Sequence, residues 1–375
     1  MPNIPLSLYI HLPWCVRKCP YCDFNSHEAK GAFPEELYVH ALLDELAMHS
    51  AMLAERPLVS IFFGGGTPSL FSPDSIAKIL QGVTQHATLA PNCEITLEAN
   101  PGTVDQERFA GFRAAGVNRL SLGIQSLQED KLKILGRIHD REQAVRAIEC
   151  VREAGFDNFN LDIMYGLPQQ TIEEALSDVQ SALAFKPTHF SWYQLTIEPN
   201  TLFHHQPPVL PVDDALWEMQ QAGQVLINSL GYQQYEVSAY AQENRECLHN
   251  KNYWEFGDYL GIGAGAHSKI TDKEKNIFRM AQTKNPRDYL EASKRRAVIK
   301  TPVSEKDRAF EFMLNALRLT EGVALHTFEQ RTGLDLIVIE STLKIAVQRG
   351  LLVSNSFRPT ERGKQYLNDL MAMFL

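Results

Sequence analysis

Short apolar runs rich in β-branched and aromatic residues alternate with longer amphipathic stretches over the first two-thirds of the chain. Runs of this kind are typical of buried strands, whereas apolar positions three and four residues apart are typical of helices. The pattern predicts strands over residues 6–11, 59–63, 94–98, 120–124, 159–164 and 190–197. It predicts helices between them over residues 35–53, 74–86, 106–115, 143–154 and 172–185. Ser72-Pro73-Asp74 and Thr171-x-x-Glu174 are typical signals for the start of a helix.

The repeated strand-helix order predicts the fold class. Six such units in succession indicate an α/β domain with a parallel sheet, either doubly wound or curved into a barrel. No G-x-G-x-x-G motif follows the first predicted strand, which counts against a dinucleotide-binding fold. In a parallel β/α barrel the carboxyl ends of the strands form the functional rim. Polar residues that follow the strands are therefore the first candidates for a site.

The pattern changes twice along the chain. A seventh strand-like run over residues 233–241 is followed by a less regular stretch up to residue 300. From about residue 303 the pattern is helical, and a short apolar run and a charged turn precede the last helix. We therefore expect a partial barrel over residues 1–240, an extension and linker over 241–300, and a small winged-helix-like domain over 301–375.

Composition excludes some functions. The chain has 375 residues and a formal net charge of −9, which argues against a nucleic-acid binder, whose affinity rests on Lys and Arg. Residues 301–375 carry nine basic and nine acidic side chains, so the predicted winged helix has no electrostatic footprint for DNA. No run approaches the ~18 apolar residues of a membrane span, and no secretory signal is visible. These features predict a cytoplasmic protein without a transmembrane segment.

Three cysteines, Cys15, Cys19 and Cys22, lie within eight residues in the spacing C-x3-C-x2-C. An iron–sulfur cube takes four ligands, usually thiolates. Three local cysteines would hold three irons and leave the fourth open to the amino and carboxylate groups of S-adenosylmethionine (SAM). The alternative is a zinc knuckle with His11 or His27 as the fourth ligand, although zinc sites usually have paired cysteines well apart in sequence.

A glycine run follows the second predicted strand, in the order Gly64, Gly65, Gly66, Thr67 and Pro68. Glycines at a strand end let backbone amides approach a ligand closely because no Cβ intervenes. By itself the run could be a tight turn. Its position one β-α unit after the cysteines makes it a candidate to receive the methionine end of SAM.

Polar side chains mark further strand ends, namely Glu98, Gln125 and Asp162. A carboxylate in an otherwise apolar strand is costly unless it is paired or hydrogen-bonded. Each acid could be a structural one, but their recurrence at one rim favours a functional interpretation. The Arg137 guanidinium could donate two hydrogen bonds to a carboxylate group, or Arg137 could lie on the surface at a helix end.

The motif His-Asn-x-x-Tyr-Trp begins at His249 in the irregular stretch, with Tyr253 and Trp254 at its end. These side chains suit a planar aromatic ligand or a haem iron. A capped loop with a buried Trp is the alternative. His267 follows a Gly-Ile-Gly-Ala-Gly run and could face the rim or cap a turn.

Together these motifs resemble the radical SAM superfamily, and within it the oxygen-independent coproporphyrinogen III oxidases and their relatives. The residues that carry the resemblance are the cysteine loop preceded by Leu-Tyr-Ile-His-Leu-Pro, and the runs Gly-Gly-Gly-Thr-Pro, Leu-Glu-Ala-Asn-Pro, Leu-Ser-Leu-Gly-Ile-Gln and Asp-Ile-Met-Tyr-Gly-Leu-Pro-x-Gln-Thr. The resemblance covers essentially the whole chain. It implies a partial (β/α)6 radical SAM barrel with a [4Fe–4S] cluster at its open rim. It also implies contacts to cluster-bound SAM from Tyr9, Gly65, Glu98, Arg137 and Asp162, and to a second SAM from Gly66 and Gln125.

Some positions depart from the oxidase pattern. Phe24 stands where the oxidase motif continues to another cysteine, and Thr196 and His267 stand where its second SAM site is apolar. The chain also begins almost at the first strand, without the oxidase's amino-terminal extension. With the motif at His249, these departures resemble the HemW family of haem chaperones. That resemblance implies binding of haem b and its transfer to acceptor haemoproteins, respiratory ones at the inner face of the membrane. We expect His249 to ligate or attach the haem.

Enzymatic activity stays open at this point. The expected SAM-site residues are all present, so the chain could cleave SAM and act on a porphyrinogen or another substrate. The departures argue against coproporphyrinogen decarboxylation. A nucleic-acid-modifying radical SAM enzyme is a third alternative, which the acidic composition disfavours. The sequence is compatible with a homodimer.

Overall fold

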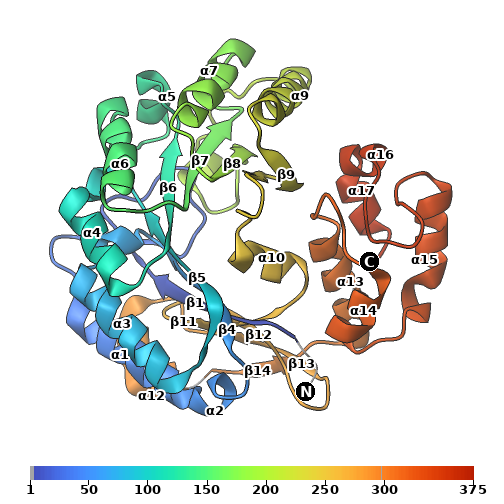
Figure 1. The fold of residues 1–375 in the computed structure, drawn as a ribbon, viewed down its shortest axis with the longest axis horizontal. Coiled ribbons are helices and arrows are strands. Elements are labelled where there is room, and N and C mark those ends of the chain that lie inside the picture. Colours follow the sequence, from blue (N-terminus) through green and yellow to red (C-terminus); the bar gives the residue numbers. More distant parts are fainter. Residues whose placement is uncertain (1–3, 297) are drawn as a thin grey trace.

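A single curved sheet organises the protein, as seen in a computed structural model that describes residues 4–296 and 298–375 (Figure 1). Residues 1–3 of the expected first domain and residue 297 of the expected linker lie outside the described residues. Across the described residues the sheet has twelve strands in the order β14-β13-β12-β11-β1-β4-β5-β6-β7-β8-β10-β9. The strand bounds are β1 Leu6–Leu12, β4 Leu58–Gly65, β5 Leu89–Ala99, β6 Arg119–Gln125, β7 Phe159–Tyr165, β8 His189–Gln194, β9 Gln233–Glu236, β10 Ala239–Ala241, β11 Asp258–Ile262, β12 His267–Thr271, β13 Ile277–Ala281 and β14 Lys300–Pro302, with a separate pair β2 Trp14–Cys15 and β3 His27–Glu28.

The six predicted strands are confirmed as β1 and β4–β8, which pair in parallel from β1 to β8. Helices cover the outside of the curve in Figure 1. Predicted helix starts are confirmed at Ser72, whose side chain accepts the Ser75 amide, and at Thr171, which forms a capping box with Glu174. The helix bounds in this part are α1 Glu35–Met48, α2 Ser50–Leu53, η1 Pro68–Leu70, α3 Pro73–His86, η2 Pro101–Thr103, α4 Gln106–Ala115, α5 Glu129–Ile134, α6 Arg141–Glu153, α7 Ile172–Leu183, α8 Leu202–His205 and α9 Asp213–Ser229.

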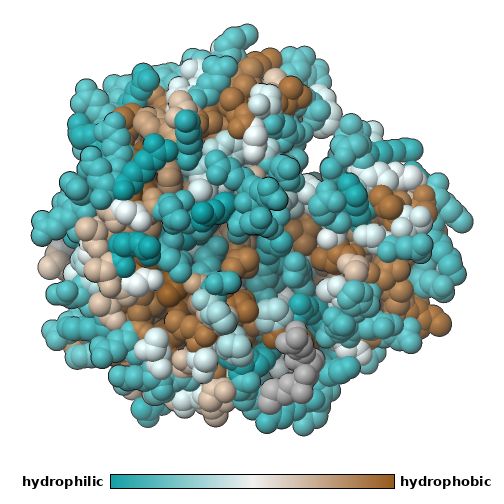
Figure 2. Space-filling view, viewed as in Figure 1, coloured by the Kyte–Doolittle hydropathy of each residue, from teal (hydrophilic) through white to brown (hydrophobic). Residues whose placement is uncertain are grey.

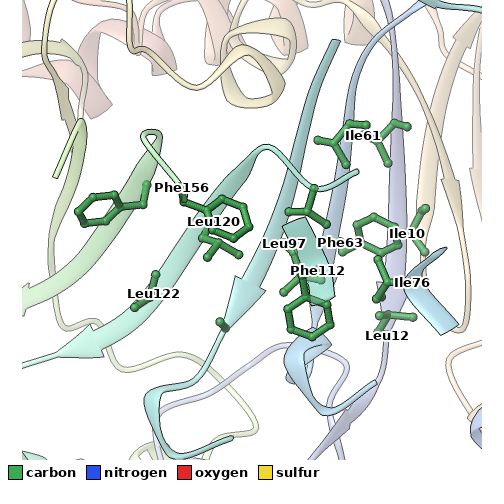
Figure 3. Packing of buried hydrophobic residues seen from close by; sticks show 14 of the residues in the cluster. Ile10, Leu12, Ile61, Phe63, Ile76, Leu97, Phe112, Leu120, Leu122 and Phe156 are labelled. Carbon is green, nitrogen blue, oxygen red and sulfur yellow. The ribbon is translucent and has the colours of Figure 1, made fainter. Parts of the chain in front are cut away.

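The alternation of side chains along each strand separates an apolar layer, which lies between the sheet and the helices, from a polar concave face. Apolar residues such as Ile10, Phe63 and Leu97 point toward the helices and pack on Ile76 and Phe112 (Figure 3). Because successive strand residues face opposite sides of a sheet, the residues between them point to the concave face. That face carries the polar groups of the site described below.

Residues 233–300 extend the sheet at both ends. The predicted strand over 233–241 is two short antiparallel strands, β9 and β10, joined by a turn. Farther along, β11 pairs in parallel with β1, and β12, β13 and β14 follow in antiparallel order. Helix α10, Leu248–Trp254, lies inside the curve of the sheet (Figure 1). The remaining short helices here are α11 Pro286–Leu290 and α12 Ala292–Arg295.

The carboxy-terminal domain has its own apolar core, centred on Phe312, Phe328 and Phe357. Its helices are α13 Glu305–Ala316, α14 Leu325–Thr332, α15 Ile337–Gln348, α16 Glu361–Gln365 and α17 Leu367–Ala372. A bridge between Leu352 and Pro359 forms the predicted small wing. Figure 2 shows a notch between this domain and the α9 side of the barrel. The fold class is therefore confirmed as an α/β barrel with a small helical carboxy-terminal domain.

Among the described residues, no helix combines the length and the apolar character that a membrane span requires.

Candidate functional site

The cysteine loop begins where β1 ends. Cys15 closes the short strand β2 and is buried, whereas Cys19 and Cys22 are half-buried. The loop turns back on itself because the Cys22 amide donates to the Cys19 carbonyl at 3.1 Å. Burial and the neighbouring thiols raise the pKa of Cys15 to about 11, and burial raises the pKa of Cys22. Binding of a cation would favour the thiolates and reverse these shifts.

The glycine run lies directly against this loop. The Gly66 amide donates to the Leu12 carbonyl at 2.8 Å, and the Thr67 amide donates to the Trp14 carbonyl at 2.7 Å. A Cβ on Gly66 would lie 2.5 Å from the Trp14 carbonyl oxygen. Gly65 has φ +118°, a conformation that favours glycine. These glycines are therefore needed so that the end of β4 can support the cysteine loop.

Two carboxyl groups, those of Glu98 and Asp162, face the interior near the loop. Burial and the negative charge of Asp162 raise the pKa of Glu98 to about 8, although the Gly65 amide donates a hydrogen bond to it. Burial also raises the pKa of Asp162, whose oxygens accept from Ser121 Oγ at 3.1 Å and Asn160 Nδ2 at 2.8 Å. Two like charges in one buried pocket favour binding of a cationic group between them.

Arg137 connects the barrel to the cysteine loop. Its guanidinium donates to the Gly123 carbonyl at 2.6 Å, and lies 3.5 Å from Cys19 Sγ and 3.5 Å from the Tyr21 hydroxyl. Nearby, the Tyr193 hydroxyl donates to Gln125 Oε1 at 2.7 Å. Gln125 has φ +72°, which is uncommon for a residue with a Cβ. Strain of this kind is often found at binding sites.

A cavity of about 470 Å³ brings most of the predicted site residues together. Its volume lies in the range of small-molecule sites. It opens at the carboxyl ends of the parallel strands, as the rim argument predicts. The predicted residues that line it are Cys15, Cys19, Cys22, Gly65, Gly66, Thr67, Glu98, Gln125, Arg137 and Asp162.

Tyr9 lines an adjoining cavity of about 380 Å³, which shares Gly65, Glu98 and Phe24 with the first. The Tyr9 hydroxyl is hydrogen-bonded to His11 Nδ1 at 3.1 Å. His267 also lines the adjoining cavity.

Thr196, the other departure from the oxidase pattern, lines none of the described cavities. Its hydroxyl donates to Glu198 Oε1 at 2.8 Å.

His249 lies at the other end of the concave face. It is buried, and its ring stacks on Phe62 with centroids 4.9 Å apart. Nδ1 is 2.9 Å from Ser60 Oγ, and Nε2 has no hydrogen-bond partner among the described residues. Burial and Arg119 lower its pKa to about 3, so the ring is neutral at physiological pH. The role assigned to His249 in haem binding stays a prediction.

The rest of the His249 motif contributes to both cavities. Asn250 lines the first cavity and Tyr253 lines the adjoining one. Trp254 packs under the Arg318 guanidinium, 4.3 Å from the ring centroid, on the side of the carboxy-terminal domain. Side chains of α10 thus face the first cavity, the adjoining cavity and the carboxy-terminal domain.

The zinc alternative meets an obstacle at the two histidines proposed for it. His11 Nε2 is 2.9 Å from the Asn25 carbonyl, and His27 Nε2 is 3.3 Å from Asn25 Oδ1. Within residues 4–296 and 298–375, no three His, Cys, Asp or Glu side chains are close enough to hold one metal ion. A cube has a different requirement, because each thiolate binds a separate iron.

Several cavity residues were missed in the sequence. Tyr21 was visible between Cys19 and Cys22, and Asn250 lay inside the recognised motif. Tyr193 and Ser191 alternate along β8 on the concave face, so a stricter strand register would have found them. Glu236 had no local signal, because it reaches the cavity only through the turn between β9 and β10.

Comparison with known proteins decides the family. The model of the radical SAM superfamily matches residues 9–182, and that of the HemN C-terminal domain matches residues 303–366. The heme chaperone HemW of Haemophilus influenzae is 50% identical over 382 residues, covering 100% of this chain and 99% of that protein. This chain belongs to the HemW family.

Further relatives match over nearly all of this chain. The heme chaperone HemW of Escherichia coli is 49% identical over 99% of this chain and 98% of that protein. The mitochondrial radical S-adenosyl methionine domain-containing protein 1 of Bos taurus is 34% identical over 98% of this chain and 87% of that protein. Membership of the radical SAM superfamily implies a [4Fe–4S] cluster and SAM for this chain.

A solved structure supports the fold. Coproporphyrinogen III oxidase (HemN) from Escherichia coli, a radical SAM enzyme, superposes with a TM-score of 0.84 and covers 100% of this chain and 91% of its own. Its sequence identity is 22%, so the likeness is one of architecture. The expected relation of the HemW family to that oxidase is thus visible in the fold.

Proposed function

We propose that this protein is a haem chaperone that binds haem b and passes it to acceptor haemoproteins. The observation that carries the proposal is the full-length match to heme chaperones HemW at 49–50% identity. The substitutions relative to the oxidase pattern support it. Phe24 stands where that pattern has an additional cysteine, and His267 stands where it has an apolar residue.

The residues around the first cavity fit a cluster and SAM. Cys15, Cys19 and Cys22 would hold three irons, because their loop opens into the cavity and none of the three forms a disulfide within the described residues. Glu98 and Asp162 suit the cationic end of SAM, since their own repulsion is relieved by a positive charge. When bound, the cluster supplies an electron that can cleave the sulfonium of SAM.

The protein residues do the positioning in this site. Arg137 is fixed on the Gly123 carbonyl and points toward Cys19, so it can balance the negative charge of thiolates. The Gly66 and Thr67 amides anchor the cysteine loop to β4.

His249 could take part in haem binding only if α10 separated from the sheet. The Glu94 carboxylate accepts from the Leu248 and His249 amides at 3.1 and 3.2 Å, and the His249 ring is enclosed by Phe62 and Tyr253. Under this hypothesis haem would replace those contacts. The hypothesis predicts that His249→Ala weakens haem binding.

The acceptors would be respiratory haemoproteins at the inner face of the membrane, met by a cytoplasmic protein. The carboxy-terminal domain offers an encounter surface, because it projects from the barrel (Figure 1) and exposes Ile337 and Val338 on α15. A homodimer is a further proposal, for which light scattering of the cluster-loaded protein is the test.

The test of function is haem transfer by the anaerobically reconstituted full chain. We expect saturable one-to-one haem binding and transfer to haem-depleted membranes, faster than transfer from haem-loaded albumin. Absence of saturable binding would refute the proposal. Formation of protoporphyrinogen from coproporphyrinogen III, with SAM and reductant, would favour the radical enzyme instead.

A further inference from the structure

His267 occupies an unusual position among the histidines of the concave face. It is the first residue of β12, and its side chain is exposed. It lines the adjoining cavity of about 380 Å³ and also a further cavity of about 440 Å³ on its other side. The imidazole therefore stands between two open volumes, each in the range of small-molecule sites.

The ring nitrogens of His267 are available. No hydrogen bond engages its imidazole within the described part of the chain, whereas both nitrogens of His11, in the same cavity, are engaged by Tyr9 and Asn25. Partial desolvation of the ring and the nearby cations Lys284 and Arg279 lower the pKa of His267, which favours the neutral ring that binds metals. His249 differs because its ring is enclosed.

The walls on both sides suit a flat apolar ligand. On one side Tyr253 and Tyr259 pack with ring centroids 4.2 Å apart, and Phe24 is 61% exposed. On the other side the cavity is lined by Val298 and by Ile299, which is 77% exposed. Binding of a macrocycle against aromatic faces and exposed aliphatic groups is favourable because it removes apolar surface from water.

A cation completes the site. Lys284 lines the same cavity as His267 and is exposed, and its ammonium has no ion pair among residues 4–296 and 298–375. Arg279 lines the cavity on the other side but is paired with Glu311. An unpaired ammonium beside an apolar groove suits a carboxylate substituent.

We propose that His267 is the protein ligand to the iron of bound haem, with Lys284 meeting a propionate and Phe24 and Tyr253 contacting the macrocycle. The proposal rests on the proposed haem-carrier function and specifies its site. Haem would then lie at the rim next to the cluster cavity, and α10 would keep its position in the barrel.

The test is haemin titration of the anaerobically reconstituted full chain, wild type beside His267→Ala, His249→Ala and His326→Ala. His326 is an exposed histidine on α14, outside the cavities that His267 lines, and is the matched control. We expect His267→Ala to weaken binding more than tenfold, about 1.4 kcal/mol. We expect His326→Ala to bind like wild type.

Spectroscopy separates iron ligation from a structural effect. Electron paramagnetic resonance of the ferric haem should change its spin-state signature in His267→Ala, and added imidazole should restore it. Lys284→Gln should weaken binding without changing that signature. Unchanged affinity and signature in His267→Ala would overturn the proposal, as would a loss confined to His249→Ala, while haem-carrier function would stand. Absence of haem binding by the wild type would instead refute the proposed function.

Discussion

Replacement of Glu98 by Gln should stabilise the cofactor-free protein at alkaline pH. The pKa of Glu98 is raised from 4.5 to about 8 by burial and by Asp162, so the folded state holds its proton more tightly than the unfolded chain does. The stability that comes from the protonated form is fully present below pH 4.5 and is lost as pH rises toward 8. At about 1.4 kcal/mol per pKa unit, the ionised carboxylate costs up to about 5 kcal/mol above pH 8.

The measurement is urea unfolding of cluster-free, SAM-free wild type and Glu98→Gln between pH 4 and pH 9. We expect the two free energies of unfolding to diverge as pH rises, with the variant more stable by 2 to 5 kcal/mol, roughly, at pH 9. Part of the gain comes from relief of Asp162, because the two carboxyl groups are coupled. Glu142→Gln, an exposed change on α6, is the control and should have no such effect.

Parallel curves for wild type and Glu98→Gln would refute the reasoning. Such a result would mean that the Glu98 carboxylate is already neutralised or solvated in the cofactor-free protein. The same variant should bind SAM more weakly, because it removes a negative charge from the cavity that we assign to SAM. Equilibrium dialysis with SAM would measure that loss, and unaltered affinity would exclude Glu98 from the SAM site.

Two further predictions follow from the cluster loop and from a buried ion pair. Cys19→Ser should abolish the brown cluster absorption after reconstitution, whereas Cys93→Ser should keep it, because the Cys93 thiol is buried away from the cavity. Iron and sulfide analysis measures the cluster content, and equal content in the two variants would contradict the ligand assignment. Lys269→Met should lower the free energy of unfolding by about 1.5 to 3 kcal/mol, because the buried Asp258 carboxylate loses the hydrogen bond from the Lys269 ammonium at 2.9 Å and keeps Arg56, at 2.8 Å, as its remaining cation. In urea unfolding at pH 7, Lys344→Met on an exposed pair should cost under about 0.5 kcal/mol, and equal costs would show that the buried pair is not needed.

The sequence determined the features that depend on neighbours along the chain. Strand and helix periods, the caps at Ser72 and Thr171, and the spacing of Cys15, Cys19 and Cys22 are local patterns. Parallel strands also bring their carboxyl ends to one rim, so the gathering of Glu98 and the other predicted residues in one cavity followed from strand order.

The tertiary structure decided which histidine is enclosed and which is exposed beside a cavity. In the sequence, residue chemistry together with the resemblance to the HemW family favoured His249 over His267. The fold encloses His249 between α10 and β4 and leaves His267 at a strand end between two cavities. Exposure of a side chain depends on elements remote in sequence, and no local period encodes it.

Long-range packing also decided how the last part of the chain joins the barrel. Residues 258–302 add strands beyond β1, a pairing that joins Asp258 to Leu6 across most of the chain. Phe256 and Ile277 belong to the core of the carboxy-terminal domain, although the sequence pattern changes only near residue 303. The sequence determined which segments form strands and helices, and the burial of apolar surface shared between distant segments decided where they lie.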